Sequence, residues 1–262
     1  MVATNIKIRT GNVSAGTSVF AMVVMDEPLS RVHPEIDLVT TPSSAPVAMV
    51  HCNNCTSDLN AWVSLFRQVL SCLDVPQLRR ALRNFIPQST GSAPDCDSLM
   101  AYNYFSVSMS PGLNRDVRCL SAVGKRLYLA NFMRTHLYTS LGALKTGLDI
   151  LMRRGRNVRQ RHRPRQFIQN PGRGAAHFGR CHEYLSPAWK PPARPLGMAI
   201  LAAYMMKSAE NPSLEKYLAD SVFACSQSTT VSPEQADVDG FNAFMQRYAK
   251  GLSVEKAAVD CL

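Results

Sequence analysis

The chain has 262 residues, of which 46% are hydrophobic, 8% aromatic and 18% charged. This hydrophobic fraction excludes a wholly disordered chain, and no apolar run reaches the roughly 18–20 residues that span a bilayer. The 29 lysines and arginines against 19 aspartates and glutamates give a formal net charge of +10 at pH 7, which excludes an acidic enzyme surface. These numbers predict a soluble, basic, globular protein with one large core.

The N-terminal part, residues 1–50, is predicted to be a small β arm followed by a proline-rich linker. Apolar and polar residues alternate over 6–10, and residues 17–25 are rich in β-branched and apolar types, with a glycine-containing turn between them. Four prolines within 26–50 indicate an ordered loop or linker. Because an isolated hairpin is marginally stable in water, this arm is expected to pack on the body or on a neighbouring subunit.

Residues 51–152 are predicted to form a helical core. Ser57 or Asp58 can cap a helix whose apolar face extends to Leu73, and a second helix follows at once and stops at Pro87. The short connection predicts an αα-hairpin or a sharp corner between the two helices.

A strand and a long helix are expected to complete this core. Residues 100–109 are compatible with a strand. Apolar residues then step by three or four along 117–151, which predicts one long helix, or two that meet near 139–142.

The remaining residues are predicted to form an arginine-rich segment with a stiff proline-rich connector (153–195) and a C-terminal helical part of the core (196–262). Residues 198–206 are apolar nearly all round, which favours a buried helix. Further helices are expected to start at Ser213 and Ser232, the latter ending at Gly251 before a short tail helix. The predicted fold class is therefore mainly α: a helical-bundle body with a small N-terminal β hairpin or arm and an arginine-rich loop.

The excess positive charge lies in one segment of the chain. Between residues 150 and 182 there are nine arginines, with no aspartate, glutamate or lysine among them. Outside this segment the basic and acidic residues nearly balance, so the rest of the protein is close to neutral. The nine are Arg153, Arg154, Arg156, Arg159, Arg161, Arg163, Arg165, Arg173 and Arg180.

This composition predicts RNA binding. Guanidinium groups bind phosphates through two parallel hydrogen bonds, and Pro164 prevents a regular helix through the alternating arginines beside it. An extended arm of this kind can follow a single-stranded phosphate backbone while Phe167 and Phe178 stack on bases. Nuclear or nucleolar targeting, an anionic membrane surface and an acidic partner remain alternatives.

The eight cysteines are too sparse for a disulfide framework, so a reducing compartment is expected. Cys52 and Cys55 together with Cys181 and His182 offer four soft ligands for tetrahedral zinc. The second pair is adjacent in sequence and more than 120 residues from the first, so the spacing is not that of a known zinc motif, and no metal site is assigned.

Catalytic motifs are absent from the sequence. We find no Walker loop, no G-x-S-x-G elbow, no H-E-x-x-H helix and no glycine-rich dinucleotide turn. The sequence therefore predicts a protein that is not an enzyme and that needs no cofactor.

The helix pair 58–86, followed by Pro87 and a strand-like stretch, resembles the coat proteins of rod-shaped plant RNA viruses. Trp62 and Phe85 carry the resemblance together with Arg79 and Arg80. In size, charge and β arms the chain is similar to the coat proteins of cileviruses. The resemblance implies a subunit that self-associates, packages RNA and acts in the host nucleolus or against RNA silencing.

The sequence-based hypothesis is thus a viral RNA-binding structural protein of coat or nucleocapsid type. Its expected partners are single-stranded RNA and further copies of itself, and its expected locations are the virion and the host cytoplasm, nucleus or nucleolus. A non-structural RNA-binding regulator and a zinc-binding enzyme are the alternatives.

Overall fold

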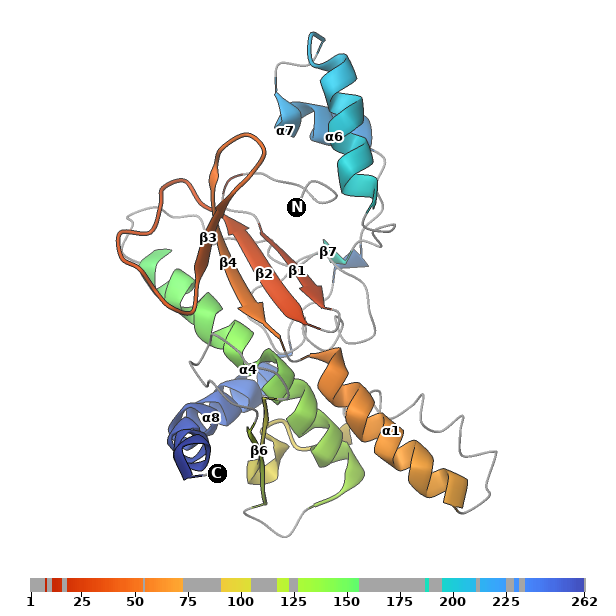
Figure 1. Ribbon diagram of the computed structural model, residues 1–262, viewed down its shortest axis with the longest axis vertical. Helices are drawn as coiled ribbons and strands as arrows, with labels where there is room; N and C mark the ends of the chain where they lie inside the picture. The colour runs from red at the N-terminus through yellow and green to blue at the C-terminus, as the bar shows by residue number, and fades with distance from the viewer. Residues whose placement is uncertain are drawn as a thin grey trace.

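The computed structural model describes most of the chain, and the described part is mixed α/β. A four-stranded sheet and a long central helix form its framework, with further strands and helices at both ends (Figure 1). The described residues are 8, 11–15, 18–53, 55–72, 91–104, 117–122, 127–155, 187–188, 195–210, 213–224, 229–230 and 234–261.

The four-stranded sheet is antiparallel, with the strand order β1-β2-β4-β3. Alternate residues of β2 and β4 are buried, because successive side chains of a strand point to opposite faces and one face lies on the core. All four residues of β3, at the edge, are exposed. The strands are β1 (Gly11–Ala15), β2 (Val19–Val24), β3 (Asp37–Thr40) and β4 (Pro46–Cys52).

The long helix α4 (Leu129–Gly155) packs its C-terminal half against the buried face of this sheet. Leu144 and Leu148 belong to the same apolar cluster as the inward residues of β2 and β4. A Cβ atom at Gly147 would lie 2.5 Å from Val50 Cγ1, so only glycine allows the helix to approach β4 this closely.

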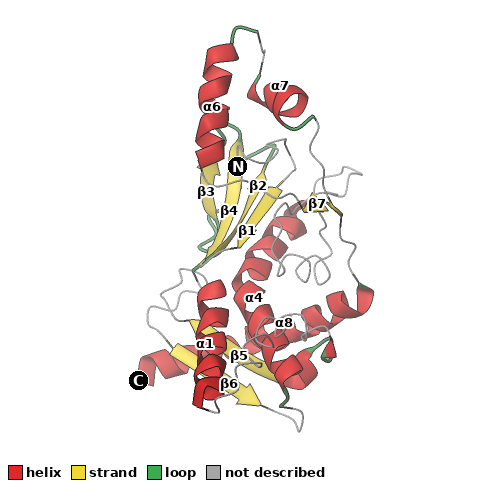
Figure 2. Cartoon of the chain, turned by 90° about the vertical axis from the view of Figure 1, so that its right-hand side faces the viewer, coloured by secondary structure: helices red, strands yellow, loops and turns green. Residues whose placement is uncertain are grey.

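The N-terminal half of α4 contacts a second group of elements (Figure 2). Tyr102 stacks on Tyr248 with ring centroids 5.0 Å apart, and its hydroxyl donates to the Tyr248 carbonyl oxygen at 2.9 Å. This contact joins the small β5–β6 sheet to the C-terminal helix. The group consists of α1 (Thr56–Cys72), the short helix η3 (Cys96–Ser98), β5 (Leu99–Tyr104), β6 (Val117–Ala122) and α8 (Gln235–Cys261).

A smaller unit lies at the opposite end of the molecule from α8 and holds α6 (Pro195–Lys207), α7 (Leu214–Tyr217) and the single turn η4 (Leu218–Val222). Its own apolar cluster is formed by Ile200 with the inward residues of α7 and η4. Ser43, in the β3–β4 turn, donates a hydrogen bond of 2.5 Å to Glu215 of α7. Two-residue strands β7 (Pro187–Ala188) and β8 (Thr229–Thr230) pair with each other.

Several helical predictions are confirmed. The helix predicted from Ser57 or Asp58 is α1, and the C-terminal part of the long helix is α4. Ser213 caps α7 by accepting a hydrogen bond from the Lys216 backbone N–H at 3.2 Å. The helix predicted over residues 75–86 lies outside the described residues.

The predicted fold class, a mainly α helical bundle with a β arm, is wrong. Residues 26–50 contain β3 and most of β4 rather than a linker, because Pro46 opens a strand where it costs no ladder hydrogen bond. Residues 117–122 form β6, not the start of a long helix, and β1 occupies the predicted turn. Helix α8 also continues through Gly251 instead of ending there.

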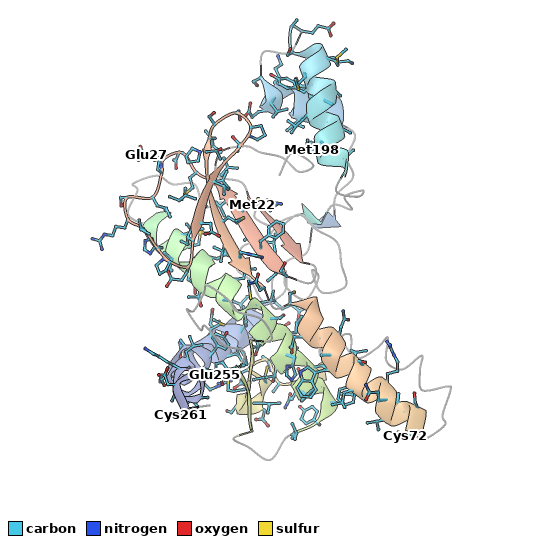
Figure 3. All side chains as sticks on the ribbon, in the orientation of Figure 1. Met22, Glu27, Cys72, Met198, Glu255 and Cys261 are labelled. Carbon is cyan, nitrogen blue, oxygen red and sulfur yellow. The ribbon has the colours of Figure 1, made fainter. Side chains whose placement is uncertain are left out.

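The expectation that residues 198–206 form a buried helix is half right. They form α6, but Met198, Met205 and Met206 are 71%, 75% and 87% exposed (Figure 3). None of the helices among the described residues combines the length and hydrophobicity needed to cross a membrane. The predicted domain boundaries stay a prediction.

Candidate functional site

The turn between β1 and β2 lies beside the connection from β4 to α1. Val19, the first residue of β2, pairs with Cys52, the last residue of β4. Ser18 and Asn53 are the next residues beyond this pair, and both are half-buried. Ser18 and Asn53 therefore lie at one edge of the sheet, and α1 begins three residues after Asn53.

The start of α1 gives this junction its chemistry. The first N–H groups of a helix have no partner within the helix, and the helix dipole places partial positive charge there. α1 has 17 residues, which is long enough for the full effect. Together with a serine hydroxyl and an asparagine amide beside it, such a helix start is suited to an anion such as a phosphate group.

A buried acid and a histidine fix the first turn of α1 to α4. Asp58 is fully buried, and its Oδ2 lies 3.4 Å from Nδ1 of His136, an ion pair when the imidazole is protonated. The His136 ring contacts both Trp62 and Phe132, with centroid distances of 4.8 and 4.4 Å. The junction therefore rests on specific contacts with the central helix.

A second buried polar cluster lies further along the same half of α4. Arg134 NH1 donates to Asp237 Oδ1 of α8 at 2.8 Å and to the Tyr138 hydroxyl at 3.3 Å. Beside it, burial raises the pKa of the Cys96 thiol to about 12. Cys96 is therefore a protonated core residue at neutral pH and not a nucleophile.

The nine arginines predicted to bind RNA are not part of the junction as far as the structure describes it. The backbones of Arg153 and Arg154 belong to the last turn of α4, and the other seven lie outside the described residues. Their role stays a prediction. The seven are Arg156, Arg159, Arg161, Arg163, Arg165, Arg173 and Arg180.

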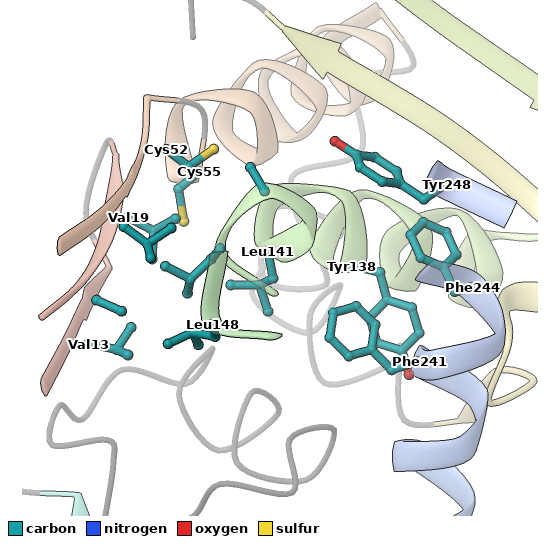
Figure 4. Close-up of a cluster of buried hydrophobic side chains, with 14 of the residues drawn as sticks. Val13, Val19, Cys52, Cys55, Tyr138, Leu141, Leu148, Phe241, Phe244 and Tyr248 are labelled. Atoms are coloured by element: carbon teal, nitrogen blue, oxygen red, sulfur yellow. The ribbon is translucent and has the colours of Figure 1, made fainter. Parts of the chain in front are cut away.

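The considered zinc ligands are only partly described. Cys52 and Cys55 are buried cysteines outside any disulfide, at the end of β4 and just before α1 (Figure 4), whereas Cys181 and His182 lie outside the described residues. Within the described ranges, no three His, Cys, Asp or Glu side chains are grouped in a way that could hold a metal ion.

Sequence reasoning missed the residues that form the junction. Asp58 was expected only to cap a helix, and His136 was passed over within an apolar helix face. A histidine on such a face, one turn after Phe132, needs a polar partner when buried, which is a usable signal. The sequence Gly16-Thr17-Ser18 between two strands is a second usable signal, although Gly16 and Thr17 lie outside the described residues.

Comparisons with known proteins identify the family. The model of the C-terminal domain of the FGGY family of carbohydrate kinases matches residues 11–165, which include the junction and α4. Because this match covers more than half of the chain, the chain belongs to the FGGY family of carbohydrate kinases. No curated protein matches the chain.

Solved structures share the fold across almost the whole chain. A xylulose kinase from Rhodospirillum rubrum has a TM-score of 0.72 and 14% identity, covering 99% of this chain and 50% of that chain. A gluconate kinase from Lactobacillus acidophilus has a TM-score of 0.73 and 11% identity, covering 99% and 49%. For Plasmodium falciparum glycerol kinase with ADP the TM-score is 0.65 and the identity 12%, with coverage of 95% and 48%.

These likenesses show the mixed α/β, actin-like fold of the kinase C-terminal domain. The chain spans about half the length of these solved relatives.

The family overturns the viral interpretation. The resemblance to plant virus coat proteins is wrong, because the matching model and the similar structures are all those of carbohydrate kinases. Single-stranded RNA and coat-type self-assembly as partners, the virion and nucleolar locations, and the regulator and zinc-enzyme alternatives lose their basis with it. The prediction that the protein is not an enzyme is also wrong, since the family is one of enzymes.

Proposed function

We propose that this chain is the nucleotide-binding part of a carbohydrate kinase, which transfers the γ-phosphoryl group of a nucleoside triphosphate to a sugar hydroxyl. The observation that carries the proposal is the family match over residues 11–165. The glycerol kinase of the same fold was solved with ADP, which supports a nucleotide as the ligand.

The junction between the β1–β2 turn and α1 is the proposed place for the nucleotide phosphates. Backbone N–H groups at the start of α1 and the hydroxyl of Ser18 donate hydrogen bonds to phosphate oxygens. In the transfer, the sugar oxygen forms a bond to the γ-phosphorus while the bond to the β–γ bridging oxygen breaks. The leaving group is the nucleoside diphosphate, and fixed donors at the phosphates stabilise its developing charge.

Calorimetric titration of ADP with magnesium chloride into the 262-residue chain tests nucleotide binding. We expect a Kd in the range of about 1 μM to 1 mM, as for typical enzyme ligands. Ser18→Tyr places a bulky ring at the junction and is expected to abolish binding. Ser253→Tyr, at an exposed position on α8, is the matched control and should bind as the wild type does.

An assay of sugar-dependent ADP release from ATP, over a panel of pentoses, hexoses and polyols, tests the transfer itself. Release that depends on one class of sugar is the expected result. If ADP does not bind at millimolar concentration and no sugar stimulates release, the proposal is wrong.

A further inference from the structure

Two helices face each other through a pair of side chains from each, spaced one turn apart. Asp58 and Trp62 are four residues apart on α1, and Phe132 and His136 are four residues apart on α4. Residues with this spacing lie on one face of a helix. Trp62 contacts Phe132 edge to face with a centroid distance of 4.9 Å, so the two rings and the imidazole form a cluster of three mutual contacts between the helices.

The acid and the imidazole make this contact directional. Asp58 is fully buried and His136 is 2% exposed, so both polar groups have left water, and they lie 3.4 Å apart. Aromatic packing alone would allow α1 to slide or rotate on α4, since dispersion contacts have little directional preference. The 3.4 Å contact between the Asp58 carboxylate and the imidazole is lost when α1 moves. This contact therefore favours one placement of the helix start.

The central helix also holds the other half of the junction. At Gly147 the backbone of α4 touches Val50 of β4, and β4 carries the register that places Ser18 beside Asn53. Gly147 is 11 residues from His136, which is about 16 Å along a helix axis. The sheet edge and the start of α1 are therefore fixed to the same rigid element, one at each of these two points.

We infer that His136 is a positioning residue for nucleotide binding: through Asp58 it fixes the first turn of α1 against α4. The backbone donors of that turn thereby keep their place relative to Ser18 and Asn53 at the proposed phosphate site. This inference rests on the proposed function for its ligand, and on the α1–α4 contact for its mechanism.

Substitutions at His136 separate positioning from ordinary packing. His136→Phe keeps an aromatic ring in contact with Trp62 and Phe132 but removes the nitrogen that faces Asp58. His136→Asn removes ring volume but places an amide nitrogen near the position of Nδ1, where it can donate to Asp58. If the ring served only packing, Phe would be the better replacement. If it positions α1, Asn is the better one.

Hydrogen exchange measured by mass spectrometry on the full chain reports directly on the hydrogen bonds at the start of α1. Residues 59–63 contain the first amides of α1 with helical hydrogen bonds, beginning with Leu59 N–H to the Cys55 carbonyl. In His136→Phe these amides are expected to exchange about 10 to 100 times faster, while His136→Asn stays within about threefold of the wild type. Val238→Ala, a change at a buried residue of α8, is the control for a general loss of stability. It should leave the exchange rate of residues 59–63 unchanged relative to the rates of the other segments.

Titration with ADP reads the consequence for the ligand. A misplacement of about 1 Å in a binding group can cost up to about 100-fold, so we expect the Kd of His136→Phe to rise by about 10- to 100-fold and that of His136→Asn by much less. Unchanged exchange at residues 59–63 in His136→Phe overturns the inference, as does unchanged ADP affinity in a variant whose exchange has risen. Absence of ADP binding by the wild type overturns the proposed function and the ligand of this inference, whereas the exchange data still decide whether His136 fixes α1.

Discussion

The two halves of α4 are both buried, but the N-terminal half holds most of the buried polar side chains. Leu141, Leu144 and Leu148 pack toward the apolar face of the sheet (Figure 4). The N-terminal half buries polar side chains as well as apolar ones such as Met133 and Leu137, and several of the polar ones bind separate segments of the chain. These buried polar residues are Asn131, Arg134, Thr135, His136, Thr139 and Ser140.

The difference teaches how one helix can join two assemblies. Apolar packing supplies most of the burial energy but tolerates small shifts, since it depends on area more than on direction. Each hydrogen bond of the other half needs its partner at a particular distance and angle: Thr139 donates to the Ala101 carbonyl at 2.7 Å, and Tyr138 donates to the Pro94 carbonyl at 3.0 Å. The apolar half attaches α4 to the sheet, and the polar half determines where the remaining elements sit.

The largest expected loss of stability comes from removing the charge of Arg134 in the polar half of α4. Its partner Asp237 has a side chain that is 10% exposed, so Arg134→Met leaves a carboxylate nearly buried without its cation. Such a change costs about 3–5 kcal/mol of unfolding free energy. The double variant Arg134→Met with Asp237→Leu removes both charges and is expected to recover at least half of this loss. Urea unfolding measures both, and a double variant as unstable as the single one would contradict the account.

A smaller effect is expected in the apolar half at Gly147. In Gly147→Ala the new Cβ meets the methyl groups of Val50 at 2.5 Å, and overpacking of this kind costs about 1–3 kcal/mol. Val50→Ala should restore part of the loss, because it removes the methyl groups in contact. Gly91→Ala, where a Cβ meets nothing within 4 Å, is the control for the substitution itself. Equal losses at the two glycines would show that the close approach of α4 to β4 is unimportant.

The smallest effect on the fold is expected at Cys96. Its reactivity tests whether solvent reaches the polar half of α4. Its pKa is raised to about 12 by burial, so its thiolate is scarce at pH 8, whereas Cys72 and Cys261 are exposed. Iodoacetamide at pH 8 should modify Cys72 and Cys261 first and Cys96 only after unfolding, as read by peptide mass spectrometry. Early modification of Cys96 would mean that this half is open to solvent.

The same shift predicts the direction of alkaline destabilisation. In the folded chain Cys96 keeps its proton up to about pH 12, whereas the unfolded thiol loses it near 9.0. The contribution of Cys96 to stability is thus complete below about pH 9 and is lost as the pH rises toward 12. Cys96→Ala should show a shallower loss of stability over this interval in urea titrations.

The helices were largely predictable because their information is local. Leu59, Val63 and Phe66 repeat at helical spacing, and the structure buries or half-buries all three in α1. The same period located α4, but it also extended the helix over Val117 and Leu120, which lie in β6. Val117 and Leu120, three residues apart, share a face of a helix but lie on opposite faces of a strand, so the helical spacing was misleading over this short stretch, where pairing with β5 decides the structure.

The sheet and the candidate site were not predictable in this way, because both depend on partners distant in sequence. β4 pairs with β2 and β3, yet its first residue is a proline that, read locally, indicates a loop. Asp58 and His136 are brought together by the packing of α1 on α4, which no local pattern encodes. Net charge was misleading for a physical reason: it reports which partners a surface attracts and not which fold carries it.

The contacts made by α8 also decide when the chain can finish folding. Arg134 and Asp237 are separated by 103 positions, Tyr102 and Tyr248 by 146, and Asp95 and Arg247 by 152. Contacts of such high contact order form late, since long loops must close before they are made. During synthesis, the polar half of α4 therefore lacks these contacts until α8 has been made, and a ribosome-bound chain without α8 exposes Tyr138 and its neighbours to chaperones or to aggregation.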